Sequence, residues 1–124
     1  LLRATAAVAT GGAFVKAAAQ VPAADLPPPG KQMKIIVPFS PGGTSDTICR
    51  RVAQKMQPDY AKAVVVENRT GAGGQIAVGY VKGRPADGTA ILQTPTSILT
   101  IYPHIYKKLP YEPLVDLSAV SLGL

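Results

Sequence analysis

One turn carries the residues that are best suited to bind a ligand. An apolar run at residues 35–37 leads into the segment VPFSPGGTSD at residues 37–46, and apolar residues with helical spacing follow. The pattern predicts a buried strand that turns into a helix. Gly42 and Gly43 permit a positive φ, and Thr44 or Ser45 can cap the helix. The free amides at the start of such a helix, together with its dipole, favour a carboxylate or a phosphate.

Two later turns repeat this chemistry. The apolar run 64–66 is followed by ENRTGAGG, and the run 90–92 is followed by QTPTS. Capping and tight connection alone explain glycines and hydroxyl residues at a single turn. The recurrence of the pattern at three turns favours a ligand site over three simple connections.

The elements that must position these turns form an α/β fold. Strands are expected near residues 34–37, 64–67 and 89–93. The first helix is expected to end near Pro58 and to face inward with Ile48, Val52 and Met56, and the second covers residues 75–82 with Ile76 and Tyr80 inward. This alternation predicts a parallel sheet, so the turns at Gly42, Gly73 and Thr94 leave the same edge and converge.

The last part of the chain has a different pattern. Residues 97–102 suit a helix or a strand, and Pro103 suits the first position of a short helix that runs through Lys108. Residues 117–124 suit a strand. With an uncovered sheet edge and so few elements, the pattern predicts part of a larger protein.

The N-terminal residues differ from this fold in composition. Residues 1–19 are rich in alanine and end in three alanines, which is typical of a secretory signal peptide, and residues 20–33 are a proline-rich linker. The remainder, 34–124, is then the folded part.

Composition excludes several classes of protein. The chain has 124 residues, 47% of them hydrophobic and 16% charged, which is typical of one globular domain. The net charge is +6, but the basic residues are scattered and not interleaved with aromatics, so a nucleic-acid surface is not expected. The single cysteine, Cys49, is expected to be a small buried residue of the first helix.

Catalytic and cofactor motifs match poorly. The segment GAGGQI has Ile76 where a dinucleotide fingerprint needs a third Gly or Ala, and neither glycine turn has the lysine of a P-loop. The acidic residues lack the spacing of metal ligands. Ser45, Asp46 and His104 could in principle form a nucleophilic triad, although Ser45 lacks the usual elbow motif. We therefore expect no metal and no cofactor, and a pocket of amides and hydroxyls with Phe39 as an apolar wall.

Four segments taken together resemble a known family. They are VPFSPGGTSD (37–46), VVVENRTGAGG (64–74), PADGT (85–89) and PHIYKKLPYEP (103–113). In this order they are similar to the Bug family, the extracytoplasmic solute receptors of tripartite tricarboxylate transporters. The resemblance extends from about Lys34 to the end of the chain.

The resemblance implies a periplasmic binding protein of type II with two lobes hinged around a small carboxylic acid. Residues 34–124 would then be the beginning of the first lobe and the start of the crossing into the second. In such receptors the three turns line one cleft, which implies the following ligand-binding residues here: Phe39, Ser40, Gly42, Gly43, Thr44, Ser45, Asp46, Gly71, Ala72, Gly73, Gly74, Thr94, Thr96 and Ser97. Two departures weaken the match, since Thr70 stands where proline is common and Pro95 removes a backbone donor.

The implied partners are a carboxylate ligand and the membrane subunits of a transporter, with no nucleic acid and no stable membrane insertion. Two alternatives stay open. One is an α/β enzyme that acts on a phosphorylated or acyl substrate in the same crevice. The other is a receptor that reports ligand occupancy to a sensor protein.

Overall fold

A computed structural model describes residues 31–122 of the chain. Its elements in order are β1 (Gln32–Val37), α1 (Thr44–Tyr60), β2 (Ala63–Asn68), the 3-10 turn η2 (Ala72–Gly74), α2 (Gln75–Lys82), β3 (Ala90–Leu92), α3 (Thr96–Thr100), α4 (Tyr102–Ile105) and α5 (Pro113–Asp116). The expected signal peptide at 1–19 and most of the expected linker lie outside the described residues. None of the described helices is long and apolar enough to cross a membrane.

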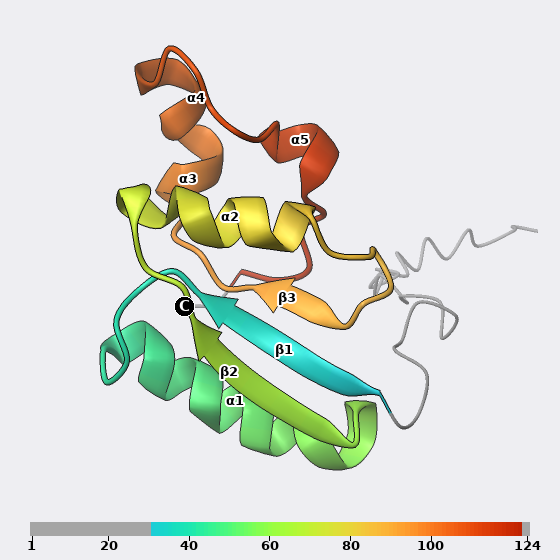
Figure 1. Cartoon of the computed structure of the whole chain (residues 1–124). Coiled ribbons are helices and arrows are strands. Elements are labelled where there is room, and N and C mark those ends of the chain that lie inside the picture. The colour runs from blue at the N-terminus through green and yellow to red at the C-terminus, as the bar shows by residue number, and fades with distance from the viewer. Residues whose placement is uncertain (1–30, 123–124) are drawn as a thin grey trace, which may run out of the picture.

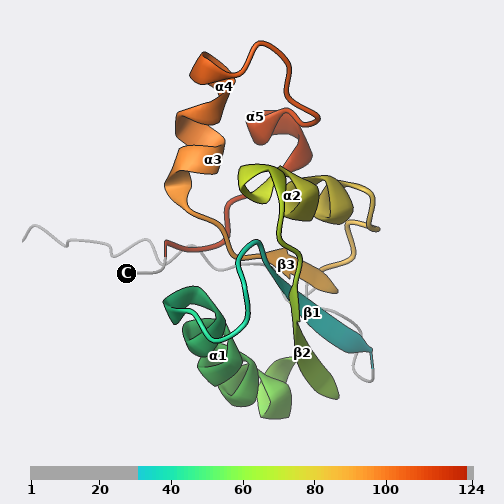
Figure 2. The ribbon, with the colours of Figure 1, turned by 60° about the vertical axis from the view of Figure 1, so that its left-hand side comes forward.

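The three described strands form a parallel sheet in the order β2-β1-β3. The chain leaves β1 on one side to form β2 and then returns past β1 to form β3. The two crossover connections thus run in opposite directions along the sheet. Since both are expected to be right-handed, their helices lie on opposite faces of the sheet. Figures 1 and 2 show this arrangement, with α1 on one face and α2 on the other. The predicted α/β fold with a parallel sheet is confirmed.

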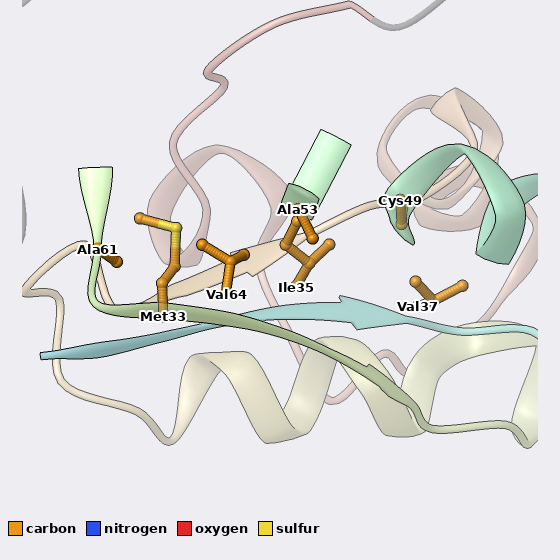
Figure 3. Close-up of a cluster of buried hydrophobic side chains, with 7 residues drawn as sticks. All are labelled: Met33, Ile35, Val37, Cys49, Ala53, Ala61 and Val64. Atoms are coloured by element: carbon orange, nitrogen blue, oxygen red, sulfur yellow. The ribbon is translucent and has the colours of Figure 1, made fainter. Parts of the chain in front are cut away.

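The first core lies between the sheet and α1. Figure 3 shows Met33, Ile35 and Val37 pointing from β1 to the side that α1 covers. Their neighbours in this cluster are Cys49, Ala53, Ala61 and Val64, all buried. Ile36 points to the opposite side and is also fully buried, so β1 is covered on both faces. This agrees with its uninterrupted run of apolar residues, which is typical of a central parallel strand.

The second core lies on the α2 side of the sheet. Val78, Ile98 and Tyr111 are buried together, with Leu92, Tyr102, Leu109 and Leu117 packed against them. The buried Tyr111 hydroxyl donates a hydrogen bond of 2.7 Å to the Ile98 carbonyl. Because a buried hydroxyl without a partner is costly, this bond fixes the segment around Tyr111 against α3.

The inward face predicted for α1 is wrong in part. Ile48 and Val52 are 48% and 44% exposed, whereas Cys49 and Ala53 are each only 4% exposed. Small side chains at these two positions let the helix lie close to the sheet, and the larger residues are displaced to its flanks. Of the three residues predicted to face inward, Met56 does pack against the core. The helix also continues past Pro58 and ends at Tyr60.

The second helix has the predicted bounds, Gln75–Lys82, but a different buried face. Its buried residues are Ala77 and Val78, whereas Ile76 is 51% exposed. Tyr80 is partly exposed and lies under the Arg69 guanidinium, which is 3.5 Å from the ring centroid. This cation–π contact explains why an aromatic residue that helical spacing places inward lies at the edge of the core.

The C-terminal elements are shorter than predicted. Residues 96–100 form a helix, and the helix expected from Pro103 to Lys108 covers only Tyr102–Ile105. The expected strand from Leu117 is wrong for residues 117–122, which form no regular element. This segment runs from α5 back past the end of β3 (Figures 1 and 2). Its residue Leu117 contributes to the second core without pairing to the sheet.

The corrected face of α1 can be tested with one substitution at two positions. Ala53→Gln should lower the free energy of unfolding by about 1–3 kcal/mol, because it overfills the space between α1 and the sheet. Ile48→Gln should change it by less than about 0.5 kcal/mol, as is usual at an exposed site. Urea denaturation followed by circular dichroism measures both. Equal losses for the two variants would contradict the assigned face.

Candidate functional site

The candidate site lies at the sheet edge where all three strands end. The Arg69 amide donates to the Val37 carbonyl (2.8 Å), and the Gln93 amide donates to the Ile36 carbonyl (2.9 Å). These bonds hold the starts of the second and third turns level with the end of β1. The strand order also reverses at β1, and ligands of open α/β sheets bind at such a switch point. The structure therefore brings the three predicted turns to the same edge of the sheet.

The first turn presents the start of α1. Gly42 has a φ of +85°, which favours glycine, and Gly43 is the N-cap residue with an extended backbone. The predicted cap by Thr44 or Ser45 is wrong, since both residues lie inside α1 and no side chain caps the helix. The first amides of a helix have no intrahelical partner, so this end retains donors for a ligand. Phe39 is 40% exposed beside them, and Ser40 is exposed.

Asp46 braces this turn from inside. It is only 3% exposed, and its Oδ2 accepts hydrogen bonds from the Gly42 amide (2.9 Å) and from Arg50 Nε (2.9 Å). Its Oδ1 accepts a hydrogen bond from Asn68 Nδ2 (3.0 Å). The hydrogen bond from Arg50, followed by those from Gly42 and Asn68, holds the pKa of the Asp46 carboxyl well below its usual range. Both carboxylate oxygens are thus occupied, so Asp46 shapes the turn and does not offer itself as a direct ligand contact.

Asn68 is a positioning residue that sequence reasoning missed. It is the last residue of β2, and its Nδ2 also donates to the Phe39 carbonyl (3.0 Å). One side-chain amide therefore ties the end of β2 to the beginning of the first turn and to its bracing carboxylate. The only signal in the sequence was an asparagine directly after an apolar strand, and this is also a common turn residue.

The second turn is left-handed throughout. Gly71, Ala72, Gly73 and Gly74 have φ values of +125°, +46°, +63° and +94°. Ala72 is the single non-glycine residue with a positive φ among residues 31–122. Such strained backbone is found mostly at functional positions. At Gly73 even a methyl group would come within 2.8 Å of the Tyr102 hydroxyl, which donates to the Gly73 carbonyl (3.1 Å).

The third turn contains buried polar atoms with no partner. Within the described residues, Gln93 Oε1 and Thr94 Oγ1 are buried and accept or donate no hydrogen bond. Buried polar groups normally have partners, so these two atoms indicate that a ligand, a water or another part of the protein completes the site. Thr96 is exposed and Ser97 is partly exposed at the start of α3. Gln93 was missed because it reads as the last residue of a strand.

The triad of Ser45, Asp46 and His104 is not assembled. Asp46 is engaged by Gly42, Arg50 and Asn68, and His104 is exposed in α4, on the opposite side of the sheet from α1. No described hydrogen bond joins the His104 side chain to Ser45 or Asp46. Residues 31–122 also contain no group of three His, Cys, Asp or Glu side chains that could hold a metal ion.

A shallow groove of about 310 Å³ lies elsewhere, along α1 and the free edge of β2. It is lined by Arg50, Ala53, Gln54, Gln57, Val64, Val65 and Val66. None of the predicted ligand-binding residues lines it. The groove is therefore a feature of the sheet edge and not of the three turns.

Comparison with known proteins agrees with this geometry. Residues 48–122 match the family described as the tripartite tricarboxylate transporter family receptor. The chain belongs to this receptor family. The resemblance to the Bug receptors is thereby confirmed, and the match includes the second and third turns.

Individual receptors show how much of the family the chain covers. It is 37% identical to the protein BugT of Bordetella pertussis over 95 residues, which are 76% of this chain and 29% of BugT. It is also 37% identical to a protein from the TAR-I ttuE-ttuC' intergenic region of Agrobacterium vitis, over 76% of this chain and 27% of that protein. The chain thus spans less than a third of the length of these relatives.

Two solved structures share the fold. The periplasmic binding protein BugD matches with a TM-score of 0.62 and 37% identity, over 68% of this chain and 28% of BugD. R. palustris Rpa4515, solved with adipate, matches with a TM-score of 0.61 and 33% identity, over 67% of this chain and 28% of that protein. The described receptor segment therefore has the fold of part of a periplasmic binding protein.

The hydrogen bonds to the Asp46 carboxylate predict that the free energy of unfolding depends on pH. Because the folded pKa is depressed, the carboxylate stabilises the fold above its ordinary value of 3.8, and this stabilisation is lost as the pH falls toward the folded pKa. Asp46→Asn should be less stable at pH 7 and should lose less stability than the parent between pH 5 and pH 3. Asp59→Asn, which removes an exposed charge from the same helix, should follow the parent. If the parent and Asp46→Asn lost the same free energy of unfolding between pH 5 and pH 3, the stabilising role of the Asp46 carboxylate would be contradicted.

Because the Gln93 side-chain carbonyl has no partner among the described residues, we expect that replacing it by an apolar side chain does not destabilise the fold. If the ligand is the partner of Oε1, Gln93→Leu should leave the ligand-free receptor unchanged or stabilise it by about 1 kcal/mol, because an unsatisfied buried acceptor is removed. Gln54→Leu, at an exposed position of α1, is the control and should have an effect within about 0.5 kcal/mol. Thermal unfolding measures both. A clear loss of stability in Gln93→Leu would mean that Oε1 has a partner beyond the described residues.

Proposed function

We propose that this chain supplies one wall of the ligand cleft in a periplasmic receptor that captures a small carboxylic acid for a tripartite transporter. The observation that carries the proposal is the convergence of three ligand-ready turns at one sheet edge. The receptor family and the adipate in Rpa4515 support the choice of a carboxylate. Export to the periplasm, by the expected signal peptide, is part of the proposal.

In this proposal the ligand is held by neutral donors. The amides of Gly43, Thr44 and Ser45 at the start of α1 face one carboxylate group, and the Gly42 amide holds the turn through Asp46. The Gly71–Gly74 turn and the hydroxyls of Thr94, Thr96 and Ser97 line the rest of the wall. Phe39 and Ser40 close one side, and the strained Ala72 lies in the second turn.

The charged groups near the first turn are already neutralised. Arg50 is paired with Asp46, and the side chain of Arg50 remains 52% exposed. Hydrogen bonds from uncharged groups to a carboxylate are strong because the acceptor carries the charge. In this proposal the site binds its ligand and does not transform it.

The proposal can be tested on the receptor in the form in which the cell produces it. Titration calorimetry with adipate, succinate and citrate should show saturable binding of at least one acid. Gly42→Val should weaken this binding at least about tenfold. Valine is strained at the φ of +85° that Gly42 adopts, so the turn should rearrange and move the first amides of α1 away from the ligand. A loss of 1.4 kcal/mol of binding free energy corresponds to a tenfold change in affinity.

Gly79→Val is the matched control, because Gly79 lies in α2 with open space around it and an ordinary backbone. This variant should keep the parent's affinity. Equal affinities of the Gly42 variant and the parent would remove the first turn from the site. Turnover of an acyl or phosphorylated substrate that depends on Ser45 would instead favour an enzyme. Ligand binding without uptake would favour a receptor that reports to a sensor.

A further inference from the structure

The second turn has a backbone form that an isolated chain does not favour. All four of its residues, 71–74, have a positive φ, and one of them, Ala72, is not a glycine. Such conformations persist only where the surrounding structure holds them. Two side chains provide this support. Arg69 acts at the entry of the turn, and Tyr102 acts on its third residue.

Tyr102 fixes the centre of the turn. Its hydroxyl donates to the carbonyl of Gly73 (3.1 Å). The amide of Gly74, in the same peptide group, donates to the carbonyl of Gly71 (2.8 Å). The peptide between Gly73 and Gly74 is thus hydrogen bonded at both of its ends. Because the Tyr102 ring packs against the second core, its hydroxyl is a donor in a defined position.

Arg69 joins the entry of the turn to the helix that follows it. Its guanidinium lies 3.5 Å from the ring centroid of Tyr80 in α2, and its Nε donates to Glu67 Oε1 (2.7 Å). The other oxygen of Glu67 accepts a hydrogen bond from Lys34 Nζ (2.9 Å). A lysine at position 69 cannot stack on the ring and donate in this way at the same time, because it lacks the planar guanidinium. The contact between Arg69 and Tyr80 therefore closes the segment that contains the whole second turn.

Two backbone donors of the turn keep no partner in this arrangement. The carbonyls of Gly71 and Ala72 each accept a hydrogen bond from the amide three residues later. The amides of Ala72 and Gly73 donate none within residues 31–122. A trans peptide places its N–H opposite its carbonyl, so the direction of these two amides is fixed through the bonded carbonyls. Donors that are already oriented bind a carboxylate without a cost for ordering them.

We propose that Arg69 and Tyr102 are positioning residues of the ligand site. They hold the second turn in its positive-φ form before a carboxylate binds to the amides of Ala72 and Gly73. The proposal rests on the proposed function, because it takes a carboxylate as the ligand. Neither side chain needs to touch the ligand. Their effect is on affinity, since a turn that the ligand must first order binds more weakly than one already formed.

Two conservative substitutions test these contacts in the receptor of full natural length. Tyr102→Phe removes only the hydroxyl, and Arg69→Lys keeps the charge but removes the planar group. Titration calorimetry with adipate, succinate and citrate measures the affinity for whichever acid the parent binds. Each variant should bind that acid at least about threefold more weakly, which is the range expected for the loss of one hydrogen bond.

Nitrogen-15 relaxation of the ligand-free receptor provides a readout that a general loss of stability does not move. The amides of Gly71, Gly73 and Gly74 should be more mobile in both variants than in the parent on the timescale of picoseconds to nanoseconds. Saturation with the acid should restore their order. A purely structural role would lower the free energy of unfolding and leave the turn and the affinity as they are in the parent.

Two matched variants control for the residue types. Tyr106→Phe removes a hydroxyl that has no described hydrogen bond, from a ring whose centroid is 5.0 Å from that of Tyr102. Arg84→Lys changes the other guanidinium near Tyr80, which is 5.7 Å from the ring centroid. Both variants should keep the affinity and the order of the turn that the parent has.

Parent-like affinity in both Tyr102→Phe and Arg69→Lys would overturn the proposal, and so would an equal loss in the two controls. An affinity that falls while the turn stays as ordered as in the parent would also overturn it, because the loss would then have another cause. If the parent binds none of the three acids, the proposed ligand is wrong. The order of the turn in the ligand-free variants then still decides whether the two side chains hold it.

Discussion

The first turn of the candidate site depends on one buried carboxylate. Asp46 is held by a backbone amide of its own turn, by a guanidinium one helical turn later and by a side-chain amide at the end of β2. These three donors come from the loop, the helix and the neighbouring strand, so a single group fixes how all three meet. A buried carboxylate needs such partners, because losing one of them would leave an uncompensated buried charge. The start of α1 is thereby set in place before any ligand arrives.

The second turn of the candidate site is organised by close backbone approach. Gly74 is buried, and a methyl group there would meet Ile98 at 2.7 Å and Pro38 at 3.1 Å. The second turn therefore packs closely between the end of β1 and α3. Tyr102 and Tyr111 each donate to a carbonyl of this region, one at Gly73 and one at Ile98. Tyr102 thus attaches α4 to the second turn, and Tyr111 attaches the segment before α5 to α3.

Much of this arrangement could be predicted from the sequence. The apolar runs and glycine turns gave the three strands and the bounds of α2, and the four motifs gave the family. The face of α1 could be predicted only in part. Burial of Cys49 was expected and is confirmed, but close packing on the sheet also selected the small Ala53 over the larger Ile48 and Val52. Asn68 and Asp46 are 22 residues apart, so nothing local indicates their bond. The segment 117–122 has the composition of a strand, yet its Leu117 is used in a core beside the sheet.

Cys49 has a consequence of its own. Its thiol lies between α1 and the sheet, 4% exposed, and burial, with a smaller effect of the Asp46 carboxylate, raises its pKa. A thiol reagent can reach it only when the helix separates from the strands. The rate at which this cysteine is modified therefore reports how often α1, which begins at the first turn, separates from the sheet. Cys49 therefore provides a chemical probe for the opening of α1 away from the sheet.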